Sequence, residues 1–222
     1  MDRTQVLNSF RKRPVSGKTD FITNYCKGKR VLDIGCIGQD NNPDRPEWLH
    51  GKIRQVATLL AGVDINTEKM EQLREQGYLL FSAITFSDKD FKDPDIVVMA
   101  DVIEHVSDIV AFLKHYKKLA SDRTVFLIST PNPYSIRQSF SILLFGRPGI
   151  NPEHTVAIDP TNMMELLDRA GFEFIDFSWL HEYDRPKKSY NKVLFQIYRL
   201  MYSVRKFWAP NYIVAVKPNK PG

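Results

Sequence analysis

The sequence predicts an α/β fold built on one doubly wound, mostly parallel sheet. Short apolar runs alternate with stretches of helical periodicity along most of its 222 residues, a pattern typical of βαβ units. The first run, residues 30–34, leads directly into a turn that contains Gly35 and Gly38. A glycine turn at the end of the first strand is where such sheets bind ligands. We therefore expect a single domain over residues 1–222.

Each apolar run is assigned to one strand, and the stretches between them to helices. The expected strands are residues 30–34, 61–65, 78–84, 95–100, 124–129, 172–179 and 212–216. The expected helices lie at about 46–60, 66–76, 109–119 and 161–170, the second one capped by Asn66 or Thr67 and stopped at Gly77. Two segments, 134–160 and 181–210, break this rhythm, and we interpret them as insertions in the domain.

The positive charge is concentrated at one end of the chain. The net charge is +5, yet residues 185–222 hold nine Lys or Arg and no Asp or Glu, so the rest of the chain is net acidic. This asymmetry favours an anionic partner such as phosphate groups, acidic lipid or nucleic acid. Two cysteines and a polar, basic start over residues 1–13 are typical of a cytoplasmic protein.

The segment Val-Leu-Asp-Ile-Gly-Cys at 31–36 resembles the first motif of class I S-adenosylmethionine-dependent methyltransferases. Glycine permits both the tight turn and the close approach of backbone to ligand. The resemblance implies a Rossmann-like sheet of about seven mostly parallel strands with an antiparallel last strand. It also implies that Asp33 lies near the methionine amino group. The cofactor loop itself would comprise Gly35, Cys36, Ile37 and Gly38.

The ends of the next strands supply the other cofactor contacts that the resemblance implies. Asp64 would bind the ribose hydroxyls, because a carboxylate can accept two hydrogen bonds, and Ile65 follows it. Ile84 and Thr85 would flank the adenine, while the segment that includes Asp101 and Val102 would close over the cofactor. Ile37 and Gln39 stand where the family has further glycines, and Ile84 stands where the family often has an acid after the third strand. A nicotinamide-dependent enzyme is the competing interpretation of the glycine turn.

The chain is most similar to a subgroup that includes ubiquinone-biosynthesis O-methyltransferases and methyltransferases of bacterial glycan clusters. The resemblance extends over about residues 29–177 and rests on Ile-Glu-His at 103–105, Thr-Pro-Asn-Pro at 130–133, Asn-Pro-Glu-His at 151–154 and the helix through 166–172. It implies O-methylation of a small molecule or saccharide, which includes a lipid-linked one, and a role in glycan biosynthesis. An RNA or protein methyltransferase and a catalytically silent scaffold stay open as alternatives.

Three side chains are candidates for the chemistry. A hydroxyl acceptor needs a base, and histidine suits that task near neutral pH. His154 is the first choice, since its segment should lie over the carboxyl edge of the sheet; its alternative role is to order that loop. Glu104 and His105 open a helix, where Glu104 could equally cap the helix and His105 could simply pack. The spacing of His, Cys and acidic residues predicts no metal site.

Apolar residues recur on one helical face between 193 and 204, and cations accompany them throughout 187–208. A basic amphipathic helix with terminal aromatic residues can lie on an anionic membrane. The same pattern is typical of a helix that covers a sheet or forms a homodimer contact. A second apolar stretch at 140–145 could add to such a surface. The sequence alone does not choose among these partners.

Overall fold

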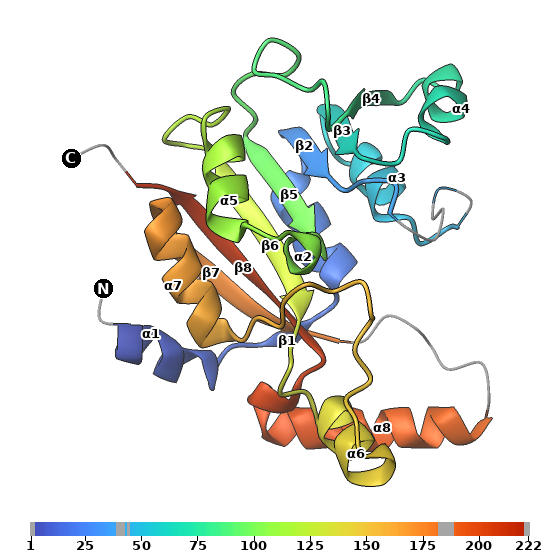
Figure 1. Ribbon diagram of the computed structural model, residues 1–222, viewed down its shortest axis with the longest axis vertical. Coiled ribbons are helices and arrows are strands. Elements are labelled where there is room, and N and C mark those ends of the chain that lie inside the picture. The colour runs from blue at the N-terminus through green and yellow to red at the C-terminus, as the bar shows by residue number, and fades with distance from the viewer. Residues whose placement is uncertain (1–2, 39–42, 44, 182–188, 220–222) are drawn as a thin grey trace.

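The computed structural model describes residues 3–38, 43, 45–181 and 189–219. Its centre is one eight-stranded sheet with the order β1-β7-β8-β6-β5-β2-β3-β4 (Figure 1). The strands are β1 (Val15–Ser16), β2 (Arg30–Ile34), β3 (Leu59–Asp64), β4 (Leu79–Ser82), β5 (Ile96–Ala100), β6 (Val125–Pro131), β7 (Phe172–Leu180) and β8 (Asn211–Pro218). Strand β8 runs antiparallel to both β6 and β7, and the other pairings are parallel. The expected antiparallel last strand is therefore confirmed.

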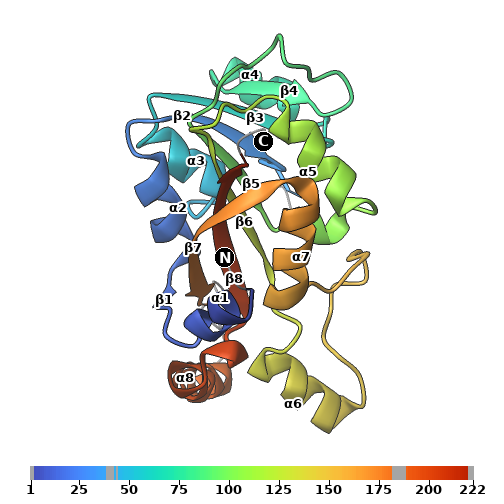
Figure 2. The same cartoon turned by 90° about the vertical axis from the view of Figure 1, so that its left-hand side faces the viewer.

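Helices cover both faces of the sheet (Figures 1 and 2). One face carries α1 (Arg3–Phe10), α5 (Ile109–Lys117) and α7 (Pro160–Ala170), whose apolar residues share a cluster with those of the central strands. The other face carries α2 (Lys18–Cys26) and α3 (Leu49–Arg54). The short helix α4 (Met70–Glu75) follows β3. This is the layered arrangement that a doubly wound sheet requires.

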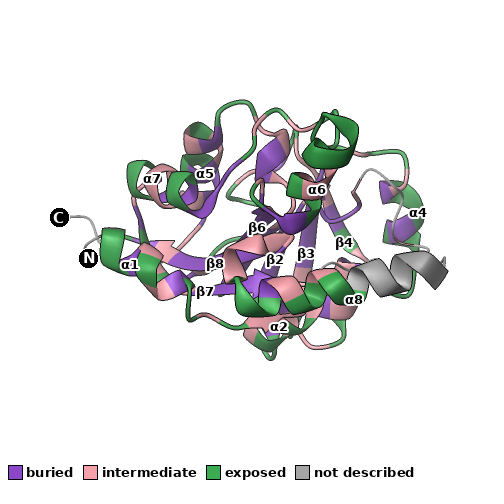
Figure 3. Ribbon diagram, turned by 90° about the horizontal axis from the view of Figure 1, so that it is seen from below, coloured by how far each residue is buried: buried purple, intermediate pink, exposed green. Residues whose placement is uncertain are grey.

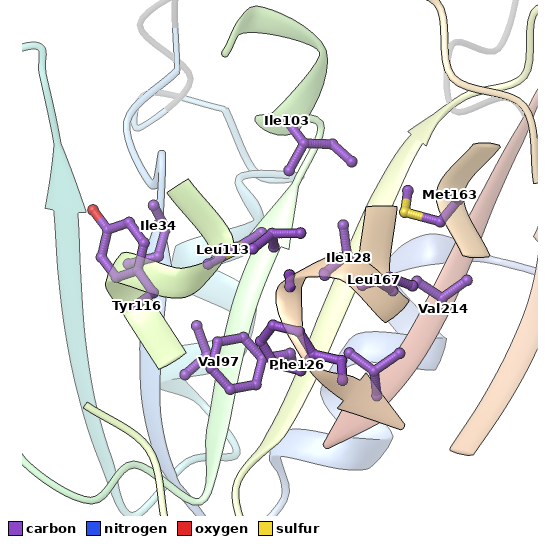
Figure 4. Close-up of a cluster of buried hydrophobic side chains, with 14 of the residues drawn as sticks. Ile34, Val97, Ile103, Leu113, Tyr116, Phe126, Ile128, Met163, Leu167 and Val214 are labelled. Carbon is purple, nitrogen blue, oxygen red and sulfur yellow. The ribbon is translucent and has the colours of Figure 1, made fainter. Parts of the chain in front are cut away.

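Alternation along the strands explains why both faces need covering. In β2, Leu32 and Ile34 join the cluster with α5 and α7, whereas Val31 packs toward α2 and α3. Figure 3 shows the resulting band of buried strands, and Figure 4 shows Ile34, Val97, Phe126 and Leu113 gathered in the larger cluster. Strands buried on both faces read as continuous apolar runs. The central strands can therefore be identified in the sequence as runs of apolar residues.

Local signals fix α7 accurately. Asp159 precedes the helix, and its carboxylate accepts hydrogen bonds from the backbone N–H groups of Thr161 and Asn162. Pro160 occupies the first turn, and Gly171 ends the helix with φ of 79°. A capping acid, an early proline and a terminal left-handed glycine are the expected start and stop of a helix. The prediction of a helix at 161–170 is confirmed.

The N-terminal half departs from the expectations in three places. The helix expected at 46–60 covers only Leu49–Arg54, because the backbone from Thr58 onward bonds to Lys29 and joins β3 beside β2. Helix α4 begins at Met70 after Lys69, without a side-chain cap from Asn66 or Thr67. The elements α1, β1 and α2 were not predicted, since β1 has only two residues and both helices are weakly amphipathic.

Both interrupting segments contain helices at the carboxyl end of the parallel strands. Helix α6 (Ile136–Phe145) follows β6, with Ser135 as its cap and Gly146 as its left-handed stop. Helix α8 (Ser189–Val204) and the 3₁₀ turn η3 (Lys206–Trp208) precede β8. The two helices extend together beyond the sheet (Figures 1 and 2). No described helix is long and apolar enough to cross a membrane.

Candidate functional site

The turn after β2 requires glycine at its first position. Gly35 has φ of 73° and donates its N–H to the carbonyl of Val63 at 2.7 Å. A Cβ atom at Gly35 would stand 2.6 Å from Cγ2 of Val102. Any other residue there would have a strained backbone, and its side chain would clash with Val102. The cofactor turn and the segment after β5 are thus packed directly against each other, as the resemblance implies.

Asp64 ties this turn to the end of β3. One carboxylate oxygen accepts the N–H groups of Ile37 at 2.8 Å and Gly38 at 3.3 Å, and the other accepts that of Asn66 at 2.8 Å. Asp64 is only 5% exposed, while Cys36 and Ile37 bury their side chains and leave only backbone for a ligand. A carboxylate offers about four lone-pair sites, so Asp64 can still accept a bond from a ligand hydroxyl.

Two aliphatic side chains stand in solvent beside Asp64. Ile65 is 80% exposed and Ile84 is 85% exposed, and they follow the paired strands β3 and β4, whose last partners are Asp64 and Ser82. Thr85 is exposed next to Ile84. Covering such exposed apolar side chains with a flat apolar group removes them from water, which lowers the free energy of the complex. That Ile84 and Thr85 flank an adenine ring stays a prediction.

Asp33 lies behind the turn rather than at the open edge. It is 3% exposed, and its Oδ2 atom is 2.8 Å from Nδ1 of His50 in α3. Burial raises the pKa of this carboxyl, while the hydrogen bond from His50 opposes that rise. This bond connects the end of β2 to α3. The implied position of Asp33 near a methionine amino group stays a prediction.

Asp101 carries a contact that the sequence did not reveal. Its backbone has φ of 55°. The Oδ1 atom accepts a hydrogen bond from the Ser129 hydroxyl at 2.8 Å, and the Oδ2 atom accepts one from the ammonium group of Lys18 in α2. Burial acts to raise the pKa of Asp101, but Lys18 and Ser129 hold it below its ordinary value. Lys18 was missed because no motif surrounds it; only the packing of α2 brings it to this edge.

The three catalytic candidates lie close together in the structure. Glu104 and His105 lie in the 3₁₀ turn η2 (Ile103–His105), and His154 lies in the segment after α6. The rings of His105 and His154 are perpendicular, with centroids 4.7 Å apart, and Nδ1 of His105 is 3.2 Å from the Glu153 carbonyl. The prediction that His154 lies over the carboxyl edge is therefore confirmed.

Glu104 is buried and incompletely bonded. It is 1% exposed; Oε2 accepts the Thr130 hydroxyl at 3.1 Å, whereas Oε1 has no hydrogen-bond partner among the described residues. Burial, together with the negative charge of Asp101, raises the pKa of Glu104 to about 8. Burial and the neighbouring His105 lower the pKa of His154. At pH 7, Glu104 therefore holds a proton and His154 is a neutral acceptor.

These three side chains could also share a cation. One ligand atom from each of Glu104, His105 and His154 lies within 4.8 Å of the others. The sequence spacing concealed this grouping, because His154 comes from a segment about fifty residues further along the chain. Histidine nitrogen and carboxylate oxygen are common ligands of transition metals. The sequence-based expectation of no metal site stays a prediction.

A cavity of about 230 Å³ adjoins this cluster. Glu104 and His154 form one wall, and residues at the end of β6, the start of α6 and the following loop form the rest. The polar lining includes Thr130, Asn132, Ser135, Arg137, Gln138 and Asn151. The motifs at 130–133 and 151–154 were sequence signals for this lining, but they were taken as signs of the subgroup rather than of the cavity. The cavity is large enough for a small polar acceptor group.

Comparison with known proteins agrees with this geometry. Residues 7–176 match the family model described as a methyltransferase domain. A probable S-adenosylmethionine-dependent methyltransferase of Mycolicibacterium smegmatis is 30% identical over 167 residues, which cover 70% of this chain and 56% of that protein. A ubiquinone biosynthesis O-methyltransferase of Haemophilus ducreyi is 22% identical over 173 residues and 69% of each chain. This chain thus spans little more than half the length of the mycobacterial relative.

Solved structures share the fold at low sequence identity. A SAM-dependent methyltransferase from Archaeoglobus fulgidus is 18% identical with a TM-score of 0.55, covering 97% of this chain and all of that one. Magnesium protoporphyrin IX methyltransferase from Synechocystis, solved with bound SAH, is 15% identical with a TM-score of 0.52, covering 90% of this chain and 81% of that one. Fold, glycine turn and family match converge: the chain belongs to the methyltransferase domain family, in its S-adenosylmethionine-dependent class I fold.

Proposed function

We propose that this protein transfers the methyl group of S-adenosylmethionine to a hydroxyl of a small molecule or saccharide. The observation that carries the proposal is the position of Glu104. Glu104 forms a wall of the polar cavity. It also lies close enough to Asp101 for that negative charge to raise its pKa. Val102, the next residue after Asp101, packs against Gly35 at the cofactor edge. Donor and acceptor would therefore meet at one point, which an in-line methyl transfer needs.

The residues at the cofactor edge fit S-adenosylmethionine. Backbone of the glycine turn can approach the methionine part, Asp64 has one lone pair left for a ribose hydroxyl, and Ile65 and Ile84 offer apolar surface to adenine. When bound, the cofactor supplies an electrophilic methyl group on a sulfonium sulfur. Relatives whose names include S-adenosylmethionine support the same assignment.

The acceptor side supports a hydroxyl. A hydroxyl is a weak nucleophile unless a base takes its proton as it attacks. The lowered pKa leaves a ring nitrogen of His154 free to accept that proton at neutral pH. Glu104, protonated at pH 7, can donate a hydrogen bond from its carboxyl group to an acceptor oxygen and hold it in place. His105 packs edge-on against His154 and limits its orientation.

Saccharide is the preferred acceptor class. The polar cavity lining supports it, because hydroxyl-rich ligands need many hydrogen-bond partners. The ubiquinone biosynthesis relatives carry O-methyltransferase in their names, which supports hydroxyl acceptors generally. An isoprenoid quinone precursor is the second candidate on that ground. We place the protein in glycan biosynthesis as the first choice.

Calorimetric titration with S-adenosylmethionine and S-adenosylhomocysteine tests the proposal first. We expect micromolar binding of both, lost or weakened at least about tenfold in Asp64→Asn, because an amide cannot replace both acceptor oxygens. Glu71→Gln, on the exposed face of α4, is the matched control and should bind like the wild type. If neither compound binds the wild type, the protein is a silent scaffold with this fold, and the enzyme proposal is wrong.

A further inference from the structure

Two helices outside the catalytic machinery expose an unusual amount of apolar surface. In α6, Ile142, Leu143, Leu144 and Phe145 are 52–76% exposed. In α8, Ile197, Leu200 and Val204 are 47–72% exposed. We call these seven residues the α6–α8 surface. Large apolar residues gathered this densely on the outside of a protein mark a site of interaction.

The two helices that carry the α6–α8 surface are held in place by packing contacts. The opposite side of α8 is anchored by Tyr202, which is 3% exposed and lies 3.2 Å from Nδ1 of His181 through its hydroxyl. The ring of Phe140 in α6 packs against that of Tyr198 in α8, with centroids 5.8 Å apart. Figure 3, which views this end of the molecule, shows that both helices carry exposed residues. The apolar residues thus point outward from a packed pair of helices.

Every charge that the two helices carry is positive. Residues 134–150 contain Arg137 and Arg147 and no acid, and no acid occurs anywhere in 185–222. Arg147, Arg199 and Arg205 are exposed beside the apolar residues. A second copy of the same surface would bring these cations together, which disfavours self-association. Nucleic acid would satisfy the cations but leave the aliphatic side chains in water.

We propose that the α6–α8 surface docks on an anionic lipid bilayer. Aliphatic and aromatic side chains would enter the boundary between headgroups and acyl chains, while the flanking arginines meet lipid phosphates. The helices are too short and too cationic to span the membrane, so the contact is peripheral.

Docking would set the acceptor cavity against the membrane. Arg137 and Gln138 of α6 line the cavity, and so do Gly149 and Ile150, which follow the exposed end of that helix. The cavity therefore opens beside the α6–α8 surface. This deepens the proposed function and rests on it: the acceptor is an amphiphile whose hydroxyl-bearing headgroup is taken directly from the bilayer.

Vesicle co-sedimentation tests the docking. The full chain is mixed with vesicles of phosphatidylcholine alone or of phosphatidylcholine with phosphatidylglycerol. We expect binding only to the anionic vesicles, weakened at least about tenfold in Leu143→Glu/Leu144→Glu and in Arg147→Glu/Arg205→Glu. The charge-matched control Lys114→Glu/Arg123→Glu, exposed on other elements, should bind like the wild type. Equal loss in this control would mean that net charge alone drives binding and would overturn the proposal.

A site-specific probe gives an independent reading. Cys26 and Cys36 are buried, so a thiol introduced by Leu144→Cys can be labelled selectively with an environment-sensitive fluorophore. Its emission should shift to the blue with anionic vesicles, and a label at Asp122→Cys should not respond. Dimers that dissociate in Leu143→Glu/Leu144→Glu, without vesicle binding, would assign the surface to a second copy instead. Titration of each variant with S-adenosylhomocysteine reports separately on the proposed function.

Discussion

The cofactor edge and the α6–α8 surface lie at the same end of the sheet but are built in opposite ways. At the cofactor edge, Asp64 makes three backbone hydrogen bonds and Gly35 fits against Val102. On the α6–α8 surface, long apolar side chains extend into solvent with cations around them. The first region is shaped in advance for one small molecule. The second is shaped to meet something outside the protein, and this division of tasks is what the following changes test.

The largest effect should come from His154. The substitution His154→Ala removes the proton acceptor, so kcat should fall by about 10²–10⁴-fold. Because burial and His105 lower the pKa of His154, the fall of the wild-type rate on the acid side should begin below the ordinary histidine range. Steady-state kinetics over a pH series measure both effects.

The affinity for S-adenosylmethionine should stay the same in His154→Ala, since this residue lines the acceptor cavity. His115→Ala, on the exposed side of α5, is the matched control and should keep wild-type kcat. A His154→Ala enzyme with unchanged kcat would leave His154 only its loop-ordering role.

Glu104 links stability to pH. Its pKa rises from 4.5 to about 8 through burial first and the charge of Asp101 second. Between these values the folded protein binds a proton that the unfolded chain does not. Its contribution is therefore complete below pH 4.5 and is lost as the pH rises through 8, a change on the order of 5 kcal/mol.

Chemical denaturation of the wild type and Glu104→Gln over this pH range measures the contribution of Glu104. The wild type should lose free energy of unfolding relative to Glu104→Gln as the pH rises. A constant difference between the two proteins at all pH values would show that Glu104 is ionised in the folded state, contrary to its burial.

Two left-handed glycines compare the regions directly. Gly35 and Gly146 have φ of 73° and 69°, but a Cβ at Gly35 meets Val102 while a Cβ at Gly146 meets nothing within 4 Å. Gly146→Ala should cost about 1–2 kcal/mol of stability from backbone strain alone. Gly35→Ala should cost about 3 kcal/mol, because the clash adds to that strain.

Only Gly35→Ala should also weaken the binding of S-adenosylmethionine. Thermal unfolding and calorimetric titration of the two variants make the comparison. Equal losses of stability together with equal affinities would mean that the Gly35–Val102 contact does not shape the cofactor turn.

Most of the sheet could be predicted from the sequence, because its strands are buried on both faces. The runs at 96–100 and 125–128 are apolar throughout, so each can be identified as a strand without an alternating pattern. The two-residue strand β1 and the weakly amphipathic α1 and α2 gave no comparable signal. Helix α3 was expected to be longer, since nothing in the local sequence shows that Leu59 and Leu60 pair with β2 instead.

The site was predicted where a motif reports backbone geometry. Gly35, Asp64 and Ile84 could be placed because each follows a strand at the carboxyl edge, where the fold brings such residues together. Lys18 could not, because its contact with Asp101 depends on how α2 packs. Asp33 follows the motif in sequence, yet its buried bond to His50 depends on the length of the loop before α3.

The division of tasks between the two regions is tested most directly by one matched pair of substitutions, measured by titration with S-adenosylhomocysteine. Ile84 and Leu144 are both exposed aliphatic residues, at 85% and 66%, so replacing either with Ser should leave the fold intact. Ile84→Ser should weaken binding about tenfold, as loss of one apolar contact predicts, and Leu144→Ser should not change it. Equal affinities in the two variants, or a loss confined to Leu144→Ser, would contradict the account.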